Sequence, residues 1–307
     1  MKNWQADLMI MLAASIWGFS YISSRWGLSS CSPALFLVLR FGVAAVAVYP
    51  LLRKSLAKAD NKLRLEGFIL GLLMGGGYIL QTYSINFTTV GRASFLTGMC
   101  LLGIPILGYV LFRQIVKTHS LIAVVIAIIG LYIFLNPSFS GINVGDVVGL
   151  ISIPVWALYM IYMSVFTEGK TDPKVTYVYL FWQLVGVVPL ALVTYIVFES
   201  GLVLPALSPD LGKGLTVTPL FLAGLLLNSL LASLLTVFLQ TVAQRFTTAV
   251  QAMLCFQMEP LVAIVAGWLV LGEPIDSHTL VGGIIILFAV IFSELGGLWI
   301  GPRKTEA

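Results

Sequence analysis

Long runs of hydrophobic residues alternate with short polar segments along most of this chain. Ten runs are each roughly 20 residues long, the length at which a helix crosses a hydrocarbon core about 30 Å thick. Backbone polar groups in lipid must be satisfied within the segment, and no run shows the period-two alternation of a membrane strand. We therefore predict an all-α integral membrane protein with ten transmembrane helices, over residues 7–28, 33–52, 67–87, 93–112, 120–136, 147–167, 175–197, 219–243, 249–271 and 279–300.

Composition supports a membrane protein. Hydrophobic residues make up 59% of the chain and charged residues 10%, with a mean hydropathy of +1.01. Soluble domains are about 25% charged. The net charge of +4 comes from the short connections between the runs. Because no connection is large enough to form a binding domain, we expect membrane lipid as a partner and no nucleic acid.

A polar pattern occurs twice along the chain. An aspartate followed ten residues later by a tryptophan recurs at a shift of 139 residues, and a set of Gln, Thr, Phe and His positions recurs at a shift of 159. The polar stretch 200–218 absorbs the difference between the two shifts. We predict two homologous halves, 1–140 and 141–307. The recurring pairs are Asp7/Asp146, Trp17/Trp156, Gln81/Gln240, Thr82/Thr241, Phe87/Phe246, Thr88/Thr247, Thr89/Thr248 and His119/His278.

The basic residues predict the orientation in the membrane, because short loops rich in Lys and Arg stay in the cytoplasm. The opposite side holds only Arg25, Arg92 and Lys213, and Arg40 lies inside the second predicted helix. We therefore expect a multi-pass protein of the cytoplasmic (inner) membrane with both termini in the cytoplasm. The predicted cytoplasmic residues are Lys2, Arg53, Lys54, Lys58, Lys62, Arg64, Arg113, Lys117, Lys170, Lys174, Arg245, Arg303 and Lys304.

Each half contains five predicted helices, so the second half enters the membrane from the opposite face. Such inverted repeats are common in secondary transporters, which rock two bundles around a site near the bilayer midplane. The three cysteines lie far apart and indicate neither a disulfide framework nor a metal cluster, and there is no phosphate-binding G-x-x-x-x-G-K-[ST] loop. We expect no cofactor, no metal and no direct ATP drive.

Motifs in both halves resemble the EamA family of the drug/metabolite transporter superfamily. The second half has the run from Gln244 to Ala249, then Glu259-Pro260 and Leu271-Gly272-Glu273. The first half has Trp17-Gly18, Arg40-Phe41, the run from Tyr83 to Ala93 and Pro105, but reads Phe112-Arg113-Gln114 where the family often has Gly-Glu. The resemblance implies ten helices, alternating access and a small metabolite as substrate, commonly an amino acid or an amphipathic compound. Similar proteins line a central cavity with their first, third, fourth, sixth, eighth and ninth helices.

Aromatic residues near the midplane are candidates for substrate binding. Trp17 and Trp156 each lie ten residues after an aspartate expected at the water boundary, which is about 15 Å of helical rise. Tyr21 and Tyr159 share helix faces with them, and we add Tyr78 beyond the glycines of the third helix. Such stripes suit an aromatic or amphipathic solute. Ordinary helix packing is an equal alternative.

Glu259 is the carboxylate predicted deepest in a span, about ten residues into the ninth helix. An ionisable group there needs a partner or a water-filled cavity. One hypothesis is that Glu259 binds a proton or a cationic group of the substrate. The other, which we favour at this point, is a hydrogen-bonded structural role beside the kink expected at Pro260.

Three further polar residues are candidates for gating. Arg40 either snorkels outward or reaches inward, where it would attract a carboxylate or pair with Glu259. Gln81 and Gln240 fall at mirrored depths in helices of opposite direction. Cross-bundle hydrogen bonds from the two glutamines would then stabilise two closed gates in turn, although either could simply hold neighbouring helices in register.

The sequence therefore predicts a secondary transporter, with export of an amino acid or aromatic compound weakly favoured. A passive channel or a non-transporting scaffold is the alternative. An intramembrane enzyme is less well supported, because the aspartates and both histidines fall at span ends or in loops, which leaves Glu259 without catalytic neighbours at depth. A homodimer is compatible with the glycine-rich last helix.

Overall fold

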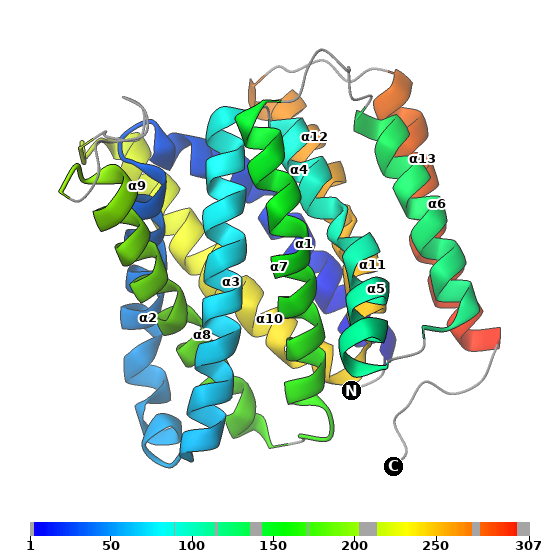
Figure 1. The fold of residues 1–307 in the computed structure, drawn as a ribbon, viewed down its shortest axis with the longest axis horizontal. Coiled ribbons are helices and arrows are strands. Elements are labelled where there is room, and N and C mark those ends of the chain that lie inside the picture. The colour runs from blue at the N-terminus through cyan, green and yellow to red at the C-terminus, as the bar shows by residue number, and fades with distance from the viewer. Residues whose placement is uncertain are drawn as a thin grey trace.

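The computed structural model describes residues 3–88, 90–113, 116–135, 143–170, 172–202, 214–271 and 277–299. These residues form a bundle of helices without β-strands (Figure 1). The elements follow the predicted hydrophobic runs in order: α1 (Asn3–Leu28), α2 (Pro33–Ala57), α3 (Asn61–Phe87), α4 (Val90–Gly98), α5 (Cys100–Phe112), α6 (Thr118–Leu135), α7 (Val144–Thr167), α8 (Pro173–Thr194), η1 (Tyr195–Glu199), α9 (Pro219–Leu226), η2 (Leu227–Leu235), α10 (Thr236–Ala243), η3 (Gln244–Phe246), α11 (Ala249–Phe256), α12 (Met258–Leu271) and α13 (Ser277–Trp299). The prediction of an all-α fold is confirmed for this part of the chain.

Seven segments of the described chain are helical, long and apolar enough to cross a membrane, and three shorter apolar helices accompany them. The protein is therefore a multi-pass membrane protein. Several helices extend beyond the hydrophobic runs into charged sequence. For example, α3 begins at Asn61, where the Asp60 side chain accepts a hydrogen bond from the Leu63 backbone N–H at 2.7 Å. Hydropathy misses such ends because helical hydrogen bonding and capping do not require apolar side chains.

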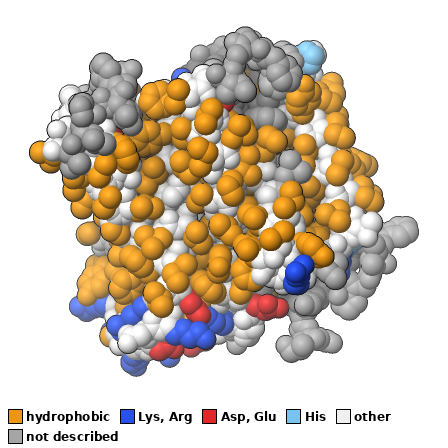
Figure 2. Space-filling model, in the orientation of Figure 1, with side chains coloured by type: hydrophobic (Ala, Val, Ile, Leu, Met, Phe, Trp, Pro, Cys, Tyr) orange, Lys and Arg blue, Asp and Glu red, His pale blue; other side chains and the backbone are white. Residues whose placement is uncertain are grey.

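The outer surface has the pattern of a membrane protein (Figure 2). A broad hydrophobic band covers the flank of the bundle, and Lys and Arg gather at its lower end. That end carries the α2–α3 and α7–α8 connections (Figure 1). Exposed residues such as Val46 on α2 and Ile284 on α13 face outward from the band.

Close packing of α3 against α8 depends on glycine. A Cβ at Gly71 would lie 2.6 Å from the Gln183 carbonyl oxygen and 2.8 Å from the Gly186 Cα. Both neighbours are backbone atoms, which cannot move aside. Gly71 and Gly186 therefore allow the two backbones to touch, as small residues do in membrane helix pairs.

Two helices are interrupted within one residue of equivalent places in the predicted halves. The break between α4 and α5 falls at Met99, and the break between α11 and α12 falls at Gln257. The Gln257 side-chain amide donates to the Gly98 carbonyl at 3.5 Å, and these two residues are 159 positions apart. Two positions related by the predicted repeat shift thus contact each other.

Candidate functional site

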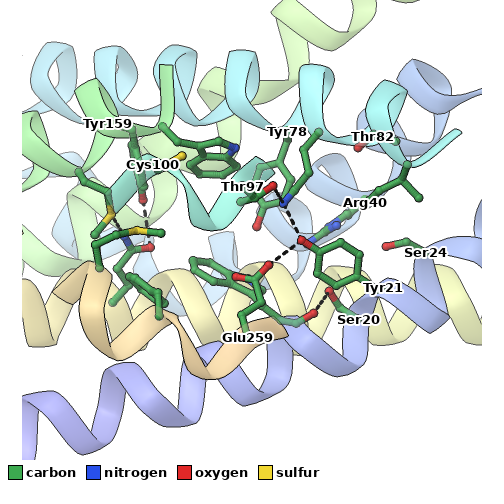
Figure 3. Close-up of a pocket in the computed structure, with 18 residues that line it drawn as sticks. Ser20, Tyr21, Ser24, Arg40, Tyr78, Thr82, Thr97, Cys100, Tyr159 and Glu259 are labelled. Atoms are coloured by element: carbon green, nitrogen blue, oxygen red, sulfur yellow. Dashed lines mark hydrogen bonds between the residues drawn. The ribbon is translucent and has the colours of Figure 1, made fainter. Parts of the chain in front are cut away.

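A cavity lies among the broken helices and α1, α2, α3, α7 and α10 (Figure 3). All nine residues proposed from the sequence for substrate binding or gating line it. Among the described side chains, those of α6, α8 and α13 do not line it. The lining consists of Trp17, Ser20, Tyr21, Ser24, Arg40, Tyr78, Gln81, Thr82, Ile85, Thr97, Cys100, Trp156, Tyr159, Met160, Gln240, Met253, Phe256 and Glu259.

Glu259 lies at one side of the cavity, in the first turn of α12. Its carboxylate accepts a hydrogen bond from the Tyr21 hydroxyl at 2.7 Å (Figure 3). The Gln81 side-chain amide donates to the Tyr21 oxygen at 3.0 Å and to the Thr97 hydroxyl oxygen at 3.2 Å. A chain of hydrogen bonds thus holds the acid in place, and the bond to Tyr21 joins the two predicted halves.

Arg40 points into the bundle and is only 3% exposed, so it does not snorkel. Its Nε donates to the Ser233 hydroxyl at 2.7 Å and its Nη2 to the Ala232 carbonyl at 3.0 Å. The guanidinium carbon lies 4.7 Å from the centre of the Tyr78 ring, a favourable cation–π distance. Within the described residues Arg40 forms no ion pair with Glu259, so the cavity holds a basic and an acidic group that do not neutralise each other directly.

The partners of Arg40 lie in η2, a nine-residue segment of π-helix. In a π-helix the backbone bonds skip one residue further than in an α-helix, and such segments are frequent at functional sites. The Ala232 carbonyl accepts from Arg40 and also from the Trp17 indole N–H at 2.7 Å. One backbone oxygen of η2 therefore orients both a basic and an aromatic wall of the cavity.

Trp156 and Tyr159 form an aromatic part of the cavity wall on α7. The Trp156 ring lies 5.1 Å from that of Tyr78 and 5.7 Å from that of Tyr159, both edge to face. A Cβ at Gly77 would lie 2.6 Å from Trp156 Cε2, so the indole packs directly on this glycine. Tyr159 donates to Gln183 at 2.8 Å.

The two glutamines proposed as gates do not bond to each other. Gln240 donates to the Met160 sulfur at 3.3 Å and to the Gln244 side-chain oxygen at 2.9 Å. The partners of Gln81 lie in the first predicted half, and these partners of Gln240 lie in the second. The structure therefore shows contacts within each half rather than the expected cross-bundle bonds, and a gating role for the pair stays a prediction.

Contacts that do cross between the halves occur in mirrored form. Thr88 donates to Asp146 at 3.1 Å, and Thr247 donates to Asp7 at 3.4 Å. These residues are the repeated pairs of the sequence. The first contact joins α3 to the start of α7, and the second joins the segment before α11 to the start of α1, which lie at opposite ends of the bundle (Figure 1).

Sequence inspection missed several polar groups that hold the helices of the bundle together. The acceptor provided by Ala232 is a backbone atom and has no side-chain signature. Gln183 in α8 is not one of the positions that recur between the two predicted halves. Glu199 is 3% exposed and accepts from the Ala34 backbone N–H and the Tyr83 hydroxyl, so it closes the N-terminus of α2 rather than lining the cavity.

Comparisons with known proteins give the family and the fold of the chain. Residues 4–136 and 143–295 match the model of the EamA-like transporter family. An uncharacterized transporter of Archaeoglobus fulgidus is 26% identical over 96% of this chain and 87% of its own length, and the uncharacterized transporter YoaV of Bacillus subtilis is 23% identical over 93% and 95%. A solved crystal structure superposes with a TM-score of 0.73 at 13% identity, covering 98% of this chain and 100% of the other, which shows a shared fold.

Proposed function

Because the chain belongs to the EamA-like transporter family, we propose that it is a secondary transporter that carries a small metabolite across the cytoplasmic membrane by alternating access. The observation that carries the proposal is the central cavity, which both predicted halves line and which contains a buried arginine, Arg40, and a half-buried glutamate, Glu259. A solute bound there would meet groups from both bundles. Movement of one bundle against the other would expose it first to one side of the membrane and then to the other.

We propose ten spans in two inverted halves, 1–140 and 141–307. The mirrored contacts Thr88–Asp146 and Thr247–Asp7 support this, because an inverted repeat places copies of one contact at opposite ends of the molecule. The contact of Gln257 with Gly98 supports a pseudo-two-fold axis at the centre. The two stretches that match the family model fall on either side of the proposed boundary.

The end of the bundle rich in Lys and Arg supports the proposed orientation (Figure 2). By the positive-inside rule this end faces the cytoplasm, and both termini lie there with it. The contact of Thr247 with Asp7 then closes the cytoplasmic end of the cavity, and the contact of Thr88 with Asp146 closes the outer end. Each contact breaks when the bundle opens at its own side.

The chemistry of the cavity favours a zwitterion with an aromatic or amphipathic body, such as an aromatic amino acid. Arg40 supplies a positive charge for a carboxylate, and Glu259 supplies a negative charge for an ammonium group. Trp17, Phe256 and Trp156 supply apolar faces between them. The Glu259–Tyr21 bond supports the structural role that the sequence favoured, but a carboxylate has further lone pairs that can also accept from a ligand.

Transport by purified protein in proteoliposomes tests this proposal. L-phenylalanine, L-tryptophan, phenethylamine and 3-phenylpropionate are the first compounds to screen, by thermal stabilisation of the detergent-solubilised protein. A carrier gives saturable uptake that unlabelled substrate inside the vesicles accelerates, whereas a channel gives non-saturating flux. Export, the direction we favour, predicts efflux from cells that express the protein.

Membrane lipid covers the apolar flank in this proposal. We also propose a homodimer that forms through the exposed face of α13. The residues that would contact the second copy are Leu280, Ile284 and Phe288. The name given to both similar proteins supports transport rather than enzymatic activity.

A further inference from the structure

The two tryptophans at equivalent positions of the halves differ in one respect. The Trp17 indole N–H donates to the Ala232 carbonyl at 2.7 Å. The Trp156 indole N–H is buried without a hydrogen-bond partner among the described residues, although its side chain is only 8% exposed. The Trp156 side chain also lines the cavity.

An unpartnered buried donor is unfavourable, since the group has lost water without gaining an acceptor. The surroundings nevertheless hold the Trp156 ring in place. Tyr78 and Tyr159 contact it edge to face, and Gly77 leaves just enough room behind it. A fixed donor with no acceptor is the arrangement expected of a binding group whose partner arrives with the ligand.

The charge near Trp156 indicates what kind of acceptor it meets. Tyr78 contacts the Trp156 ring and also lies under the Arg40 guanidinium. Two of the five guanidinium N–H groups donate to Ser233 and Ala232, which leaves others for a ligand. A positive charge that shares the Tyr78 contact with the indole favours an anionic acceptor over a neutral one. The Glu259 carboxylate instead accepts a hydrogen bond from Tyr21, which lies on α1 rather than on α7 with Trp156.

We propose that Trp156 is a specificity-determining residue, and that its indole N–H binds the carboxylate of the substrate next to Arg40. This rests on the proposed function and deepens it, because it assigns the carboxylate end of the substrate to the wall formed by α7, α3 and α2. The amino end then lies toward Glu259.

The test compares two probes that differ in the carboxylate, L-phenylalanine and phenethylamine, in wild-type protein and in Trp156→Phe. We expect the substitution to weaken binding of L-phenylalanine by about 10-fold, since a hydrogen bond to a charged group is lost. Binding of phenethylamine, which has no acceptor for the indole, should change by less than about 2-fold, a smaller effect than the lost charged hydrogen bond. Dissociation constants are measured in detergent by isothermal titration calorimetry, a readout that does not use tryptophan fluorescence.

Phenylalanine is smaller than tryptophan, so a second variant separates packing from hydrogen bonding. Replacement of Trp156 by the isostere benzothienylalanine keeps the ring size and removes only the donor, and it should show the same selective loss. Trp17→Phe is the matched control, and it should lower thermal stability without discriminating between the probes. Equal weakening of both probes, or of neither, by the isostere would overturn the proposal for Trp156. If wild-type protein binds no carboxylate-bearing compound of the panel, the proposed substrate class fails, and this inference fails with it.

Discussion

Arg40 combines a structural and a binding role at a single side chain. Its bonds to Ser233 and Ala232 tie α2 to η2, and the side chain also lines the cavity. We predict that Arg40→Gln lowers the affinity for a carboxylate-bearing substrate by at least about 10-fold, because the charge-assisted bonds are lost. Titration with L-phenylalanine measures this.

Arg40→Lys is the matched control, because it keeps the charge but loses the planar fork that bonds two groups at once. It should retain part of the affinity and lose part of the thermal stability. A Gln variant that folds, inserts and transports at the wild-type rate would remove Arg40 from the mechanism.

Glu259 allows the binding and structural hypotheses to be separated. In Glu259→Gln the amide oxygen can still accept from Tyr21, so the local hydrogen bond and the fold should persist. We predict near wild-type thermal stability but a loss of transport of amine-bearing substrates by about 10-fold or more, since the negative charge is gone. Proteoliposome uptake checks this. Unchanged uptake would leave Glu259 with the structural role alone.

For single residues, the sequence predicted well which side chains line the cavity, and there is a physical reason for this. Charged and aromatic residues deep in apolar helices are costly unless they face a protected interior, so Arg40, Glu259 and the paired tryptophans mark the cavity from their depth alone. It did not predict their partners. A backbone acceptor such as Ala232 depends on π-helical geometry, which leaves no pattern in hydropathy.

The helix pair α3 and α8 shows how elements position the site. Gly71 allows backbone contact between them, and α3 carries Tyr78 and Gln81 into the cavity. We predict that Gly71→Ala destabilises the protein by about 1–3 kcal/mol, because the added Cβ meets backbone atoms that cannot shift. Thermal unfolding in detergent measures the change.

Gly42→Ala on α2 is the control for Gly71→Ala, because a Cβ there meets no atom within 4 Å. It should be neutral or slightly stabilising, since alanine favours the helix over glycine. If both variants lose the same stability, the close approach of α3 and α8 is not the cause.

The sequence predicted where the helices lie better than it predicted where they end or are interrupted. The hydrophobic runs located every helical segment in order, since burial in lipid needs a minimum apolar length. The interruptions at Met99 and Gln257 and the π-helix η2 lie inside the predicted runs 93–112, 249–271 and 219–243. Hydropathy has no means to separate a continuous helix from a broken one, because both bury the same side chains.

For the whole molecule, the two inverted halves that we propose make alternating access testable with matched variants. The contacts Thr88–Asp146 and Thr247–Asp7 close opposite ends in our proposal, so loss of one should favour opening at its own end. Thr→Val removes the hydroxyl at nearly constant volume. The aspartates are less suitable, since Asp146 also belongs to the capping box of α7.

We predict that Thr88→Val raises labelling of a cavity cysteine from the outside, and that Thr247→Val raises it from the cytoplasmic side. A hydrogen bond in a membrane protein contributes about 0.6 kcal/mol on average, so each population shift should be roughly 3-fold. Reporters are Thr82→Cys and Met253→Cys with the native cysteines replaced by alanine, and membrane-impermeant maleimide is applied to either face of the vesicles.

In the double variant the two shifts oppose each other, and labelling should return toward the wild-type ratio, because the equilibrium responds only to the difference between the end states. Shifts in the same direction for both single variants would show that the two contacts do not close opposite ends, and an inverted arrangement of the halves could not then explain their mirrored geometry.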